Sequence, residues 1–429
     1  MSFANKAVNK NKLVVDSPNS SPNLMKVLIL NAGSSTHKSS LYEIAGETLS
    51  ERASEPLWKA GIDWTATADR GVLSVKAKRS TIEIELESSD RPQGIARMLE
   101  TLVRGETKVI EQFSEIDVVG HRVVHGGIDY TQATQVTPAV KAAIARLIPL
   151  APAHNPAHLE GIDAIAQVLG DIPQVAVFDT AFHSQMPPQA AVYPIPYEWF
   201  ERGIRRYGFH GISHQYCARR AAQLLGKPLE SLKLITCHLG NGCSLAAIKN
   251  GISIDTTMGF TPLEGLMMGS RSGSIDPAIL IYLMREYNFD ADRVNEMLNQ
   301  ESGLKGVSGV SSDWRAIEAA IAQGNQRAQL AVDIYIHRLR ACIGSMLASL
   351  GGLDAIVFTA GVGENAASVR EKACQAFEFL GLKLDKEKND NRPVDENIAT
   401  RDSTVRVLVI HTEEDWAIAQ QCWGIMNDE

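Results

Sequence analysis

Residues 234–277 read LITCHLGNGCSLAAIKNGISIDTTMGFTPLEGLMMGSRSGSIDP, and this stretch decides the fold. It opens with an apolar run, Leu234–Cys237, that predicts a buried strand, and a second apolar run begins at Ser244. The turn between them contains Gly240 and Gly242, whose backbone freedom allows several N–H groups to point into one concavity. Such a concavity suits a phosphate, although a single glycine turn more often marks a plain hairpin.

A second phosphate-compatible element closes the same stretch. Gly269-Ser-Arg-Ser-Gly273 places Arg271 in a loop of small residues. The guanidinium group of arginine offers a planar fork of N–H donors that matches the oxygens of a phosphate or a carboxylate. The competing interpretation is a surface arginine surrounded by water. After the loop, Asp276-Pro277 predicts the N-cap and the first residue of a helix.

The same pattern occurs elsewhere in the chain. An apolar run at Val27–Leu30 is followed by Asn31-Ala-Gly-Ser-Ser35 and a further strand over Ser40–Ile44. A third apolar run, Ala355–Phe358, precedes Thr359-Ala-Gly-Val-Gly-Glu-Asn365. Repeated junctions of a strand with a glycine turn indicate a duplicated nucleotide-binding core.

Longer motifs accompany these junctions. They are Asn31-Ala-Gly-Ser-Ser35, Gly120-His-Arg-Val-Val-His-Gly-Gly127, His154-Asn-Pro156, Tyr207-Gly-Phe-His-Gly211, His238-Leu-Gly-Asn-Gly242, Met258-Gly-Phe-Thr-Pro-Leu-Glu-Gly265 and Thr359-Ala-Gly-Val-Gly-Glu-Asn365. Together, from about Met25 to the C-terminus, they closely resemble the acetate kinase family. The resemblance implies an α/β protein with a two-domain, duplicated actin-like (ribonuclease H-like) ATPase fold. Sugar kinases, heat-shock chaperone ATPases and actin share this fold, and its active site lies in a cleft between the domains.

The resemblance also implies an activity. An acetate kinase transfers a phosphoryl group reversibly from ATP to acetate, by direct in-line transfer, and forms acetyl phosphate and ADP. Such a transfer requires mainly alignment of the reactants and positive charge around the three equatorial oxygens. The implied cofactor is Mg²⁺, or Mn²⁺ in its place, the nucleotide substrates are ATP and ADP, and the expected assembly is a homodimer.

The composition is that of an ordinary globular enzyme. Of 429 residues, 45% are hydrophobic and 21% are charged, and the length suffices for two or three domains. A net charge of −8 argues against nucleic acid or an anionic membrane as a partner. Six cysteines are scattered without a CxxC pair or a zinc spacing, which favours a reducing cytoplasm. No apolar run approaches the roughly 18 residues of a membrane-spanning helix.

The chain is expected to divide into three parts. Residues 1–24 are rich in Asn, Ser and Lys and have little to bury, which predicts a flexible and dispensable tail. The resemblance places an N-terminal actin-like domain at 25–179, completed by 412–429, and a C-terminal nucleotide-binding domain at 180–411. Closing the cleft between the domains would exclude water, which competes with acetate as phosphoryl acceptor.

Local patterns predict several further elements. Residues 71–75 and 81–86 predict a hairpin, because apolar and polar residues alternate in Ile82-Glu-Ile-Glu-Leu86. Helices are predicted over 94–109, 140–150 and 326–350, and Gly351-Gly352 ends the last of them. Strands that alternate with helices argue for α/β layers.

The catalytic residues are assigned by the resemblance. Arg122 and Arg271 are implied to contact the carboxylate and the transferring phosphoryl group, and Asp179 to lie near substrate and metal. His210 is implied to stabilise the transition state together with Arg271. A histidine next to Phe209 would otherwise be interpreted as a core residue, but the flanking glycines and the motif favour the catalytic role.

The nucleotide and metal sides follow in the same way. The residues implied for ATP binding are Lys38, His238, Gly240, Asn241, Gly242, Asp313, Arg315, Gly361, Gly363, Glu364 and Asn365. His154 resembles a secondary histidine near the phosphates. Asn31 and Glu414 are implied for the metal, and Mg²⁺ prefers few carboxylates with water and phosphate oxygens. Because His411-Thr-Glu-Glu-Asp415 departs from the family pattern, Glu413 remains the alternative to Glu414.

The implied acyl pocket consists of Val124, Ala153, Phe209 and Pro262. Ala153 stands where acetate kinases commonly have leucine. Either a neighbouring side chain fills the space, or the pocket is larger and the enzyme also acts on propionate.

Two other functions compete with the kinase. A chaperone-like or actin-like ATPase would share the fold, so the fold does not decide between them. However, no segment is left for a peptide-binding domain, and Arg122 and Arg271 have no evident task in an ATPase that acts on water. A dinucleotide-dependent oxidoreductase would need a GxGxxG motif after a strand and an acidic residue about 20 positions later, and the sequence lacks that combination.

Overall fold

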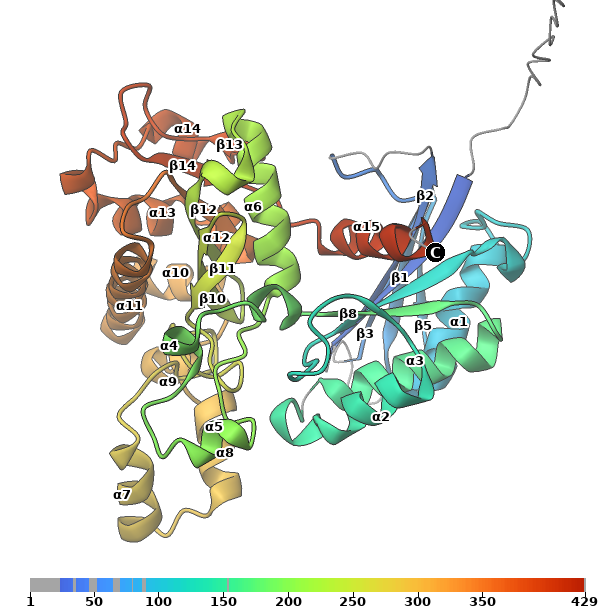
Figure 1. The fold of residues 1–429 in the computed structure, drawn as a ribbon, viewed down its shortest axis with the longest axis horizontal. Coiled ribbons are helices and arrows are strands. Elements are labelled where there is room, and N and C mark those ends of the chain that lie inside the picture. The colour runs from blue at the N-terminus through green and yellow to red at the C-terminus, as the bar shows by residue number, and fades with distance from the viewer. Residues whose placement is uncertain are drawn as a thin grey trace, which may run out of the picture.

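The structure, a computed structural model, describes residues 24–33, 36–45, 52–64, 70–78, 80–86, 90–152 and 154–427. Two β-sheets with their covering helices form two halves that lie beside one another (Figure 1). Expectations for the tail up to residue 23 and for Ala153 lie outside the described residues. Within the described ranges, no helix combines the length and the apolar character needed to cross a membrane.

The N-terminal sheet has the strand order β5-β4-β3-β2-β1-β6-β8-β7. Successive residues of β1 face opposite sides of this sheet, as the alternation of a strand requires. Leu28 and Leu30 pack in a core shared with α1 and α3, whereas Val27 and Ile29 pack in a core shared with α15. The strands are β1 (Leu24–Ala32), β2 (Thr36–Ala45), β3 (Trp58–Asp63), β4 (Val72–Ala77), β5 (Ser80–Glu85), β6 (Val118–Val123), β7 (Thr134–Gln135) and β8 (Gln174–Phe178), and the helices are α1 (Arg91–Val103), α2 (Pro138–Arg146), α3 (Asn155–Leu169) and α15 (Glu414–Asn427).

The C-terminal sheet has the strand order β11-β10-β9-β12-β14-β13. Leu234 of β9 packs in the core that contains α6, whereas Ile235 and Cys237 pack in the core that contains α11. The strands are β9 (Lys233–Leu239), β10 (Cys243–Lys249), β11 (Ile252–Thr256), β12 (Ala355–Thr359), β13 (Glu396–Asn397) and β14 (Arg406–Val409). The helices are α4 (Pro188–Ala191), α5 (Glu198–Glu201), α6 (Gly211–Leu225), α7 (Ala278–Glu286), α8 (Ala291–Gln300), α9 (Gly303–Ser308), α10 (Trp314–Ala322), α11 (Gln326–Leu350), α12 (Ala360–Asn365), α13 (Ala367–Gln375) and α14 (Lys386–Asp390).

The two sheets repeat one topology. In the first, β1 pairs antiparallel with β2 and parallel with β6, and the series β3-β2-β1-β6-β8 runs across the sheet. In the second, β9 pairs antiparallel with β10 and parallel with β12, and the series β11-β10-β9-β12-β14 has the same order and directions. The duplicated α/β core predicted from the repeated glycine junctions is therefore confirmed.

Most predicted elements form, with differences at their ends. The strands at 27–30, 40–44, 234–237 and 355–358 are present, and the helix over 326–350 is α11. The helix predicted over 94–109 ends at Val103, just before Gly105 turns the chain with φ 80°. The glycines of the third junction lie in the helix α12, which follows β12 directly. β3 has no counterpart among the predicted strands.

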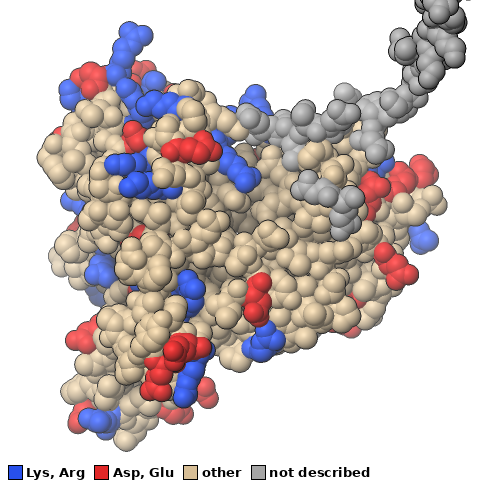
Figure 2. Space-filling view, viewed as in Figure 1, with Lys and Arg blue, Asp and Glu red and all other residues tan. Residues whose placement is uncertain are grey.

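In the part of the chain that the structure describes, the backbone passes between the halves in two places. β8 leads through Asp179 to the segment that contains α4, α5 and α6, and β14 leads through residues 411–413 to α15. The domain bounds given above stay a prediction. On the face seen in Figure 2, acidic and basic side chains are interspersed over both halves.

Candidate active site

A cavity of about 640 Å³ lies between the two halves and is lined by residues of both. The strand ends that bear the glycine turns meet there, which explains why motifs far apart in the chain converge. The predicted site residues that line it are Asn31, Lys38, Arg122, His210, His238, Gly240, Asn241, Gly242, Gly361, Glu364, Asn365 and Glu414.

The N-terminal side of the cavity holds a bidentate ion pair. Arg122, at the end of β6, donates from Nη2 to Asp179 Oδ2 at 2.7 Å and from Nε to Asp179 Oδ1 at 3.1 Å. Its Nη1 donates to Asn31 Oδ1 at 3.3 Å and lies 3.9 Å from Glu414 Oε2. Burial disfavours the cation, but the carboxylates of Asp179, Glu414 and Asp415 together outweigh this effect and raise the pKa of Arg122. Asp179 therefore fixes the guanidinium group at the cavity edge, rather than facing the cavity itself.

His210 lies opposite, immediately before α6, in the left-handed conformation with φ 55°. Its ring stacks on that of His238 with centroids 4.1 Å apart. Burial, together with the neighbouring His238, lowers the pKa of His210 well below its usual value. Burial and then the charge of Arg122 lower the pKa of His238 to about 4. Both rings are therefore neutral near pH 7.

Arg271 is the second guanidinium group of the site. It donates from Nη1 to the Pro262 carbonyl at 2.8 Å, and within the described part of the chain no carboxylate pairs with it. Burial lowers the pKa of Arg271. A largely buried cation without a carboxylate partner is costly unless an anion binds to it. Arg271 thus marks the position where an anionic substrate is expected.

Gly242 lies where His210 and Arg271 meet. A Cβ placed on it would lie 3.4 Å from Arg271 Nη1 and 3.5 Å from His210 Nε2. Neither Gly240 nor Gly242 adopts a positive φ, so the predicted reason for these glycines is wrong. The absence of a side chain at Gly242 instead leaves space in front of the Arg271 guanidinium group and the His210 ring.

The nucleotide-side residues fall into two sets. Glu364, at the end of α12, accepts from the Ala360 N–H at 2.9 Å and lies 2.6 Å from His411 Nδ1. This contact, which the sequence did not indicate, joins α12 to the second crossing between the halves, and the Glu364 carboxylate raises the pKa of His411. Asp313 and Arg315 lie elsewhere: they form an ion pair of 2.7 Å outside the residues that line the cavity, and Asp313 caps α10.

Two residues of the predicted acyl pocket are buried in the core. Val124 and Phe209 are 5% and 1% exposed and belong to one apolar cluster, which also contains Tyr207. Pro262 is linked to this region through its hydrogen bond with Arg271. Gly363, predicted on the nucleotide side, is buried behind the cavity.

The cavity also presents oxygen donors suited to a magnesium ion. Glu414 and Asp415 begin α15, and Asp415 accepts from Ser40 Oγ at 2.8 Å and from Asn31 Nδ2 at 3.5 Å. The described residues contain no group of three or more His, Cys, Asp or Glu side chains that could hold a metal ion. This donor set fits Mg²⁺, which is commonly held by one or two carboxylates together with phosphate oxygens and water. Asp415 and Ser40 are site residues that sequence reasoning missed, although the acidic run contained the first.

The contacts of Glu413 and Glu414 differ, and they favour Glu414 as the residue that holds the metal ion. Glu414 lies beside Arg122, whereas Glu413 lies 3.7 Å from His411 Nε2. We expect Glu414→Ala to raise the Mg²⁺ concentration for half-maximal activity by about tenfold or more, since even outer-shell partners of a metal contribute 10–100-fold. Glu413→Ala is the matched control, and titration of activity with MgCl₂ is the measurement. A larger shift in the Glu413→Ala enzyme would place the metal at Glu413.

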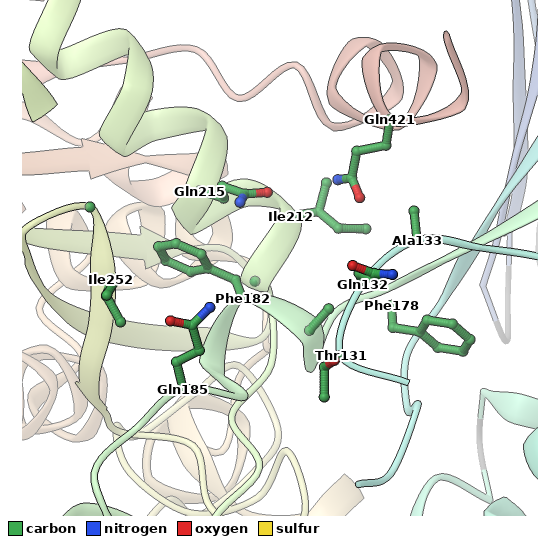
Figure 3. A pocket seen from close by; sticks show the side chains of 13 residues that line it. Thr131, Gln132, Ala133, Phe178, Phe182, Gln185, Ile212, Gln215, Ile252 and Gln421 are labelled. Atoms are coloured by element: carbon green, nitrogen blue, oxygen red, sulfur yellow. The ribbon is translucent and has the colours of Figure 1, made fainter. Parts of the chain in front are cut away.

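A second, smaller cavity of about 180 Å³ lies outside this site (Figure 3). It is lined by Thr131, Gln132, Ala133, Phe178, Ala181, Phe182, Gln185, Gly211, Ile212, Gln215, Gly251, Ile252 and Gln421. None of these side chains is charged, so this cavity does not suit a nucleotide or a metal ion.

Comparison with known proteins agrees with this geometry. The Acetokinase family profile matches residues 26–420. Acetate kinase of Rippkaea orientalis is 72% identical over 403 residues, which cover 94% of this chain and all of that protein. The crystal structure of Porphyromonas gingivalis acetate kinase has a TM-score of 0.85 at 41% identity and covers 94% of this chain and all of its own. A propionate kinase from Francisella tularensis has a TM-score of 0.84 at 38% identity and covers 92% of this chain and 98% of its own. The family profile matches nearly the whole described chain, and the acetate kinase of Rippkaea orientalis is identical at 72% of the aligned positions. The chain therefore belongs to the acetokinase family.

Proposed function

We propose that this protein is an acetate kinase, which transfers the γ-phosphoryl group of ATP to acetate in a reversible, Mg²⁺-dependent reaction. The observation that carries the proposal is Arg271, a largely buried guanidinium group without a carboxylate partner among the described residues, beside the neutral His210. An ATPase that acts on water has no need for a second guanidinium group at this point. Family membership supports the same conclusion.

In the proposed reaction, a carboxylate oxygen of acetate attacks the γ-phosphorus in line. The bond between phosphorus and the oxygen bridging to ADP breaks, and acetyl phosphate forms. Arg122 and Arg271 hold the carboxylate and the equatorial oxygens and offset their negative charge. His210, neutral, donates one hydrogen bond to the same group. Asn31 and Glu414 would hold Mg²⁺, which supplies further positive charge at the phosphates.

The nucleotide is proposed to lie along the C-terminal side of the cavity. The turn between β9 and β10 and the start of α12 both line it, and both come from the sheet that repeats the N-terminal topology. Lys38, from β2, faces the same cavity and is suited to the phosphates. Asp313 and Arg315 are proposed to lie near the adenosine. Their neighbour Ser312 lies close to Gly269, and Gly269 packs against Asn241, which lines the cavity.

An acyl-hydroxamate assay tests the proposal. The protein is incubated with ATP, Mg²⁺, acetate and hydroxylamine, which traps acetyl phosphate as a coloured iron complex. Product that depends on both acetate and ATP is the expected result. ATP hydrolysis at the same rate with and without acetate would favour the chaperone-like or actin-like ATPase instead.

Replacement of His210 by alanine separates its role from nucleotide binding. We expect kcat to fall by about 10²-fold or more, the loss typical for one hydrogen-bond donor to developing charge. The KM for ATP should change little, because the contact is proposed to strengthen in the transition state. Steady-state kinetics with ATP as the varied substrate measure both kcat and the KM for ATP. A change confined to the KM for ATP would assign His210 to the nucleotide site.

The acyl specificity is proposed to include propionate, because Ala153 removes bulk that a leucine would supply. One methylene group in an apolar pocket changes discrimination by about 10–200-fold. Ala153→Leu is therefore expected to lower kcat/KM for propionate while that for acetate stays nearly unchanged. The ratio of the two values is measured with both acids. An unchanged ratio would show that Ala153 does not set the size of the acyl group.

The assembly is proposed to be a homodimer formed through α7. No residue of this helix is buried, and Ile279, Ile281, Tyr282 and Met284 are between 44% and 57% exposed. A row of exposed apolar side chains commonly marks a protein interface. Light scattering of the wild type and of a Tyr282→Glu variant tests the assembly and its location. The six cysteines are free thiols, in keeping with the proposed cytoplasmic location.

A further inference from the structure

A chain of hydrogen bonds reaches His210 from behind, through residues that the proposed reaction does not use. Ser244 Oγ, in β10, lies 2.9 Å from His210 Nδ1 and 2.7 Å from His214 Nε2. His214 Nδ1 lies 2.7 Å from Thr236 Oγ1 of the neighbouring strand β9. Ser244, His214 and Thr236 are all 0% exposed, so these contacts lie away from the protein surface.

Few protons are available to form this series of hydrogen bonds. A hydroxyl group has one proton, so Ser244 donates to one of the two rings and accepts from the other. Burial lowers the pKa of both His210 and His214 well below the usual value, so each ring is neutral and carries one N–H. The two tautomers are therefore linked. If Ser244 donates to His210 Nδ1, the His210 proton is on Nε2; if Ser244 donates to His214, the His210 proton is on Nδ1.

The cavity distinguishes the two arrangements. His210 lines the cavity, and its Nε2 lies near the space that Gly242 leaves beside Arg271. Within the described part of the chain, no protein group bonds to this nitrogen. Phosphoryl and carboxylate oxygens accept hydrogen bonds, so only an Nε2–H faces them favourably, while a bare Nε2 lone pair would repel them.

We propose that Thr236, His214 and Ser244 act as positioning residues that hold His210 as the Nε2–H tautomer, so that it donates to the transferring phosphoryl group. The hydrogen bonds run in one direction: Thr236 Oγ1 donates to His214 Nδ1, His214 Nε2 to Ser244 Oγ, and Ser244 Oγ to His210 Nδ1. The inference rests on the proposed kinase function for the identity of the acceptor. It names residues that set the donor but do not touch the substrate.

A neighbouring histidine provides a matched control. His183 Nε2 donates to the Phe209 carbonyl at 3.0 Å, and its Nδ1 lies 2.7 Å from Ser253 Oγ. Ser253, in β11, is as buried as Ser244, and its removal breaks the same kind of serine–histidine hydrogen bond. No hydrogen bond joins the ring of His183 to that of His210 in the described residues, so its loss should leave the His210 tautomer unchanged.

The kinetic test compares Ser244→Ala with Ser253→Ala. We expect Ser244→Ala to lower kcat by about 10–100-fold, the range for outer-shell partners that orient a histidine, with KM for ATP changed less than about twofold. Ser253→Ala should lose similar thermal stability but keep most of its kcat. Ser244→Thr, which keeps a hydroxyl group at this position, should be more active than Ser244→Ala. Equal losses of kcat in the two alanine variants would overturn the proposal, because they would show a merely structural effect.

Nitrogen NMR of protein labelled with ¹⁵N-histidine reads the tautomer directly. The His210 signals are identified by their loss in His210→Ala, and inorganic phosphate serves as the probe anion. The expected result is Nε2–H in the wild type and a mixed tautomer in Ser244→Ala. An Nδ1–H tautomer in the phosphate-bound wild type would overturn the proposal, even if Ser244→Ala failed to fold. A wild type with Nε2–H that makes no acetyl phosphate would instead refute the proposed function and leave the tautomer assignment standing.

Discussion

Arg271→Ala is expected to lower kcat by about 10²–10³-fold, the loss measured for single groups that stabilise developing negative charge. The side chain is largely buried, donates to the Pro262 carbonyl and has no carboxylate partner among the described residues, so its charge is available to the substrate. Its removal leaves no buried carboxylate unpaired. We therefore expect the melting temperature to change little.

The hydroxamate assay gives kcat, and differential scanning fluorimetry gives the melting temperature. Arg327→Ala is the matched control, because Arg327 also donates to a backbone carbonyl, that of Val307 at 2.9 Å, but lies beside Gly309 and not beside the cavity-lining Gly242. Near-normal turnover of the Arg271→Ala enzyme would remove Arg271 from the proposed mechanism. Arg271→Lys should recover only part of the activity, since a lysine keeps the charge but loses the fork.

Arg122→Ala is expected to damage both activity and stability. The kcat should fall by about 10²–10³-fold for the same electrostatic reason. In addition, Asp179, which is 1% exposed, would lose the bidentate partner that holds it. Removing one member of a buried ion pair typically costs about 3–5 kcal/mol, so the free energy of unfolding should drop by that order.

A double variant separates the two effects of Arg122. Arg122→Ala combined with Asp179→Asn removes both charges of the pair, so much of the lost stability should return, while the activity should stay low. Urea unfolding and the hydroxamate assay measure the two quantities on the same samples. If the double variant were no more stable than Arg122→Ala alone, the unpaired Asp179 would not be the cause of the instability. If Arg122→Ala kept its activity, the carboxylate or phosphoryl group would have to be held by Arg271 without it.

The sequence by itself determined the repeated parts of the protein. Apolar runs followed by glycine-rich turns predicted β1, β9 and β12, and the repeat predicted a duplicated α/β core. Hydrophobic periodicity with Gly351 at its end predicted α11 over its whole length. These features depend on residues close together in the chain, because strand alternation, helix periodicity and helix termination are local properties. The long motifs also indicated the family, which the comparisons confirm.

The tertiary structure alone decided which of these residues touch. The parallel register of β6 and β8 places Arg122 near the chain that follows Phe178, and so sets its ion pair with Asp179. The pairing of β9 with β10 sets Ser244 beside His238, and packing of α6 on this sheet brings His210 to the same hydroxyl group. Sheet register and helix packing join residues far apart in the chain, and no local pattern in the sequence carries that information.

Two corrections have the same origin. Gly242 was predicted to serve through its backbone angles, yet it serves through the space that it leaves between His210 and Arg271. Glu364 was predicted only as a nucleotide-side residue, yet it also contacts His411 across the second crossing. The identity of a residue shows what it can do, but its neighbours in the folded chain decide which of its capacities is used.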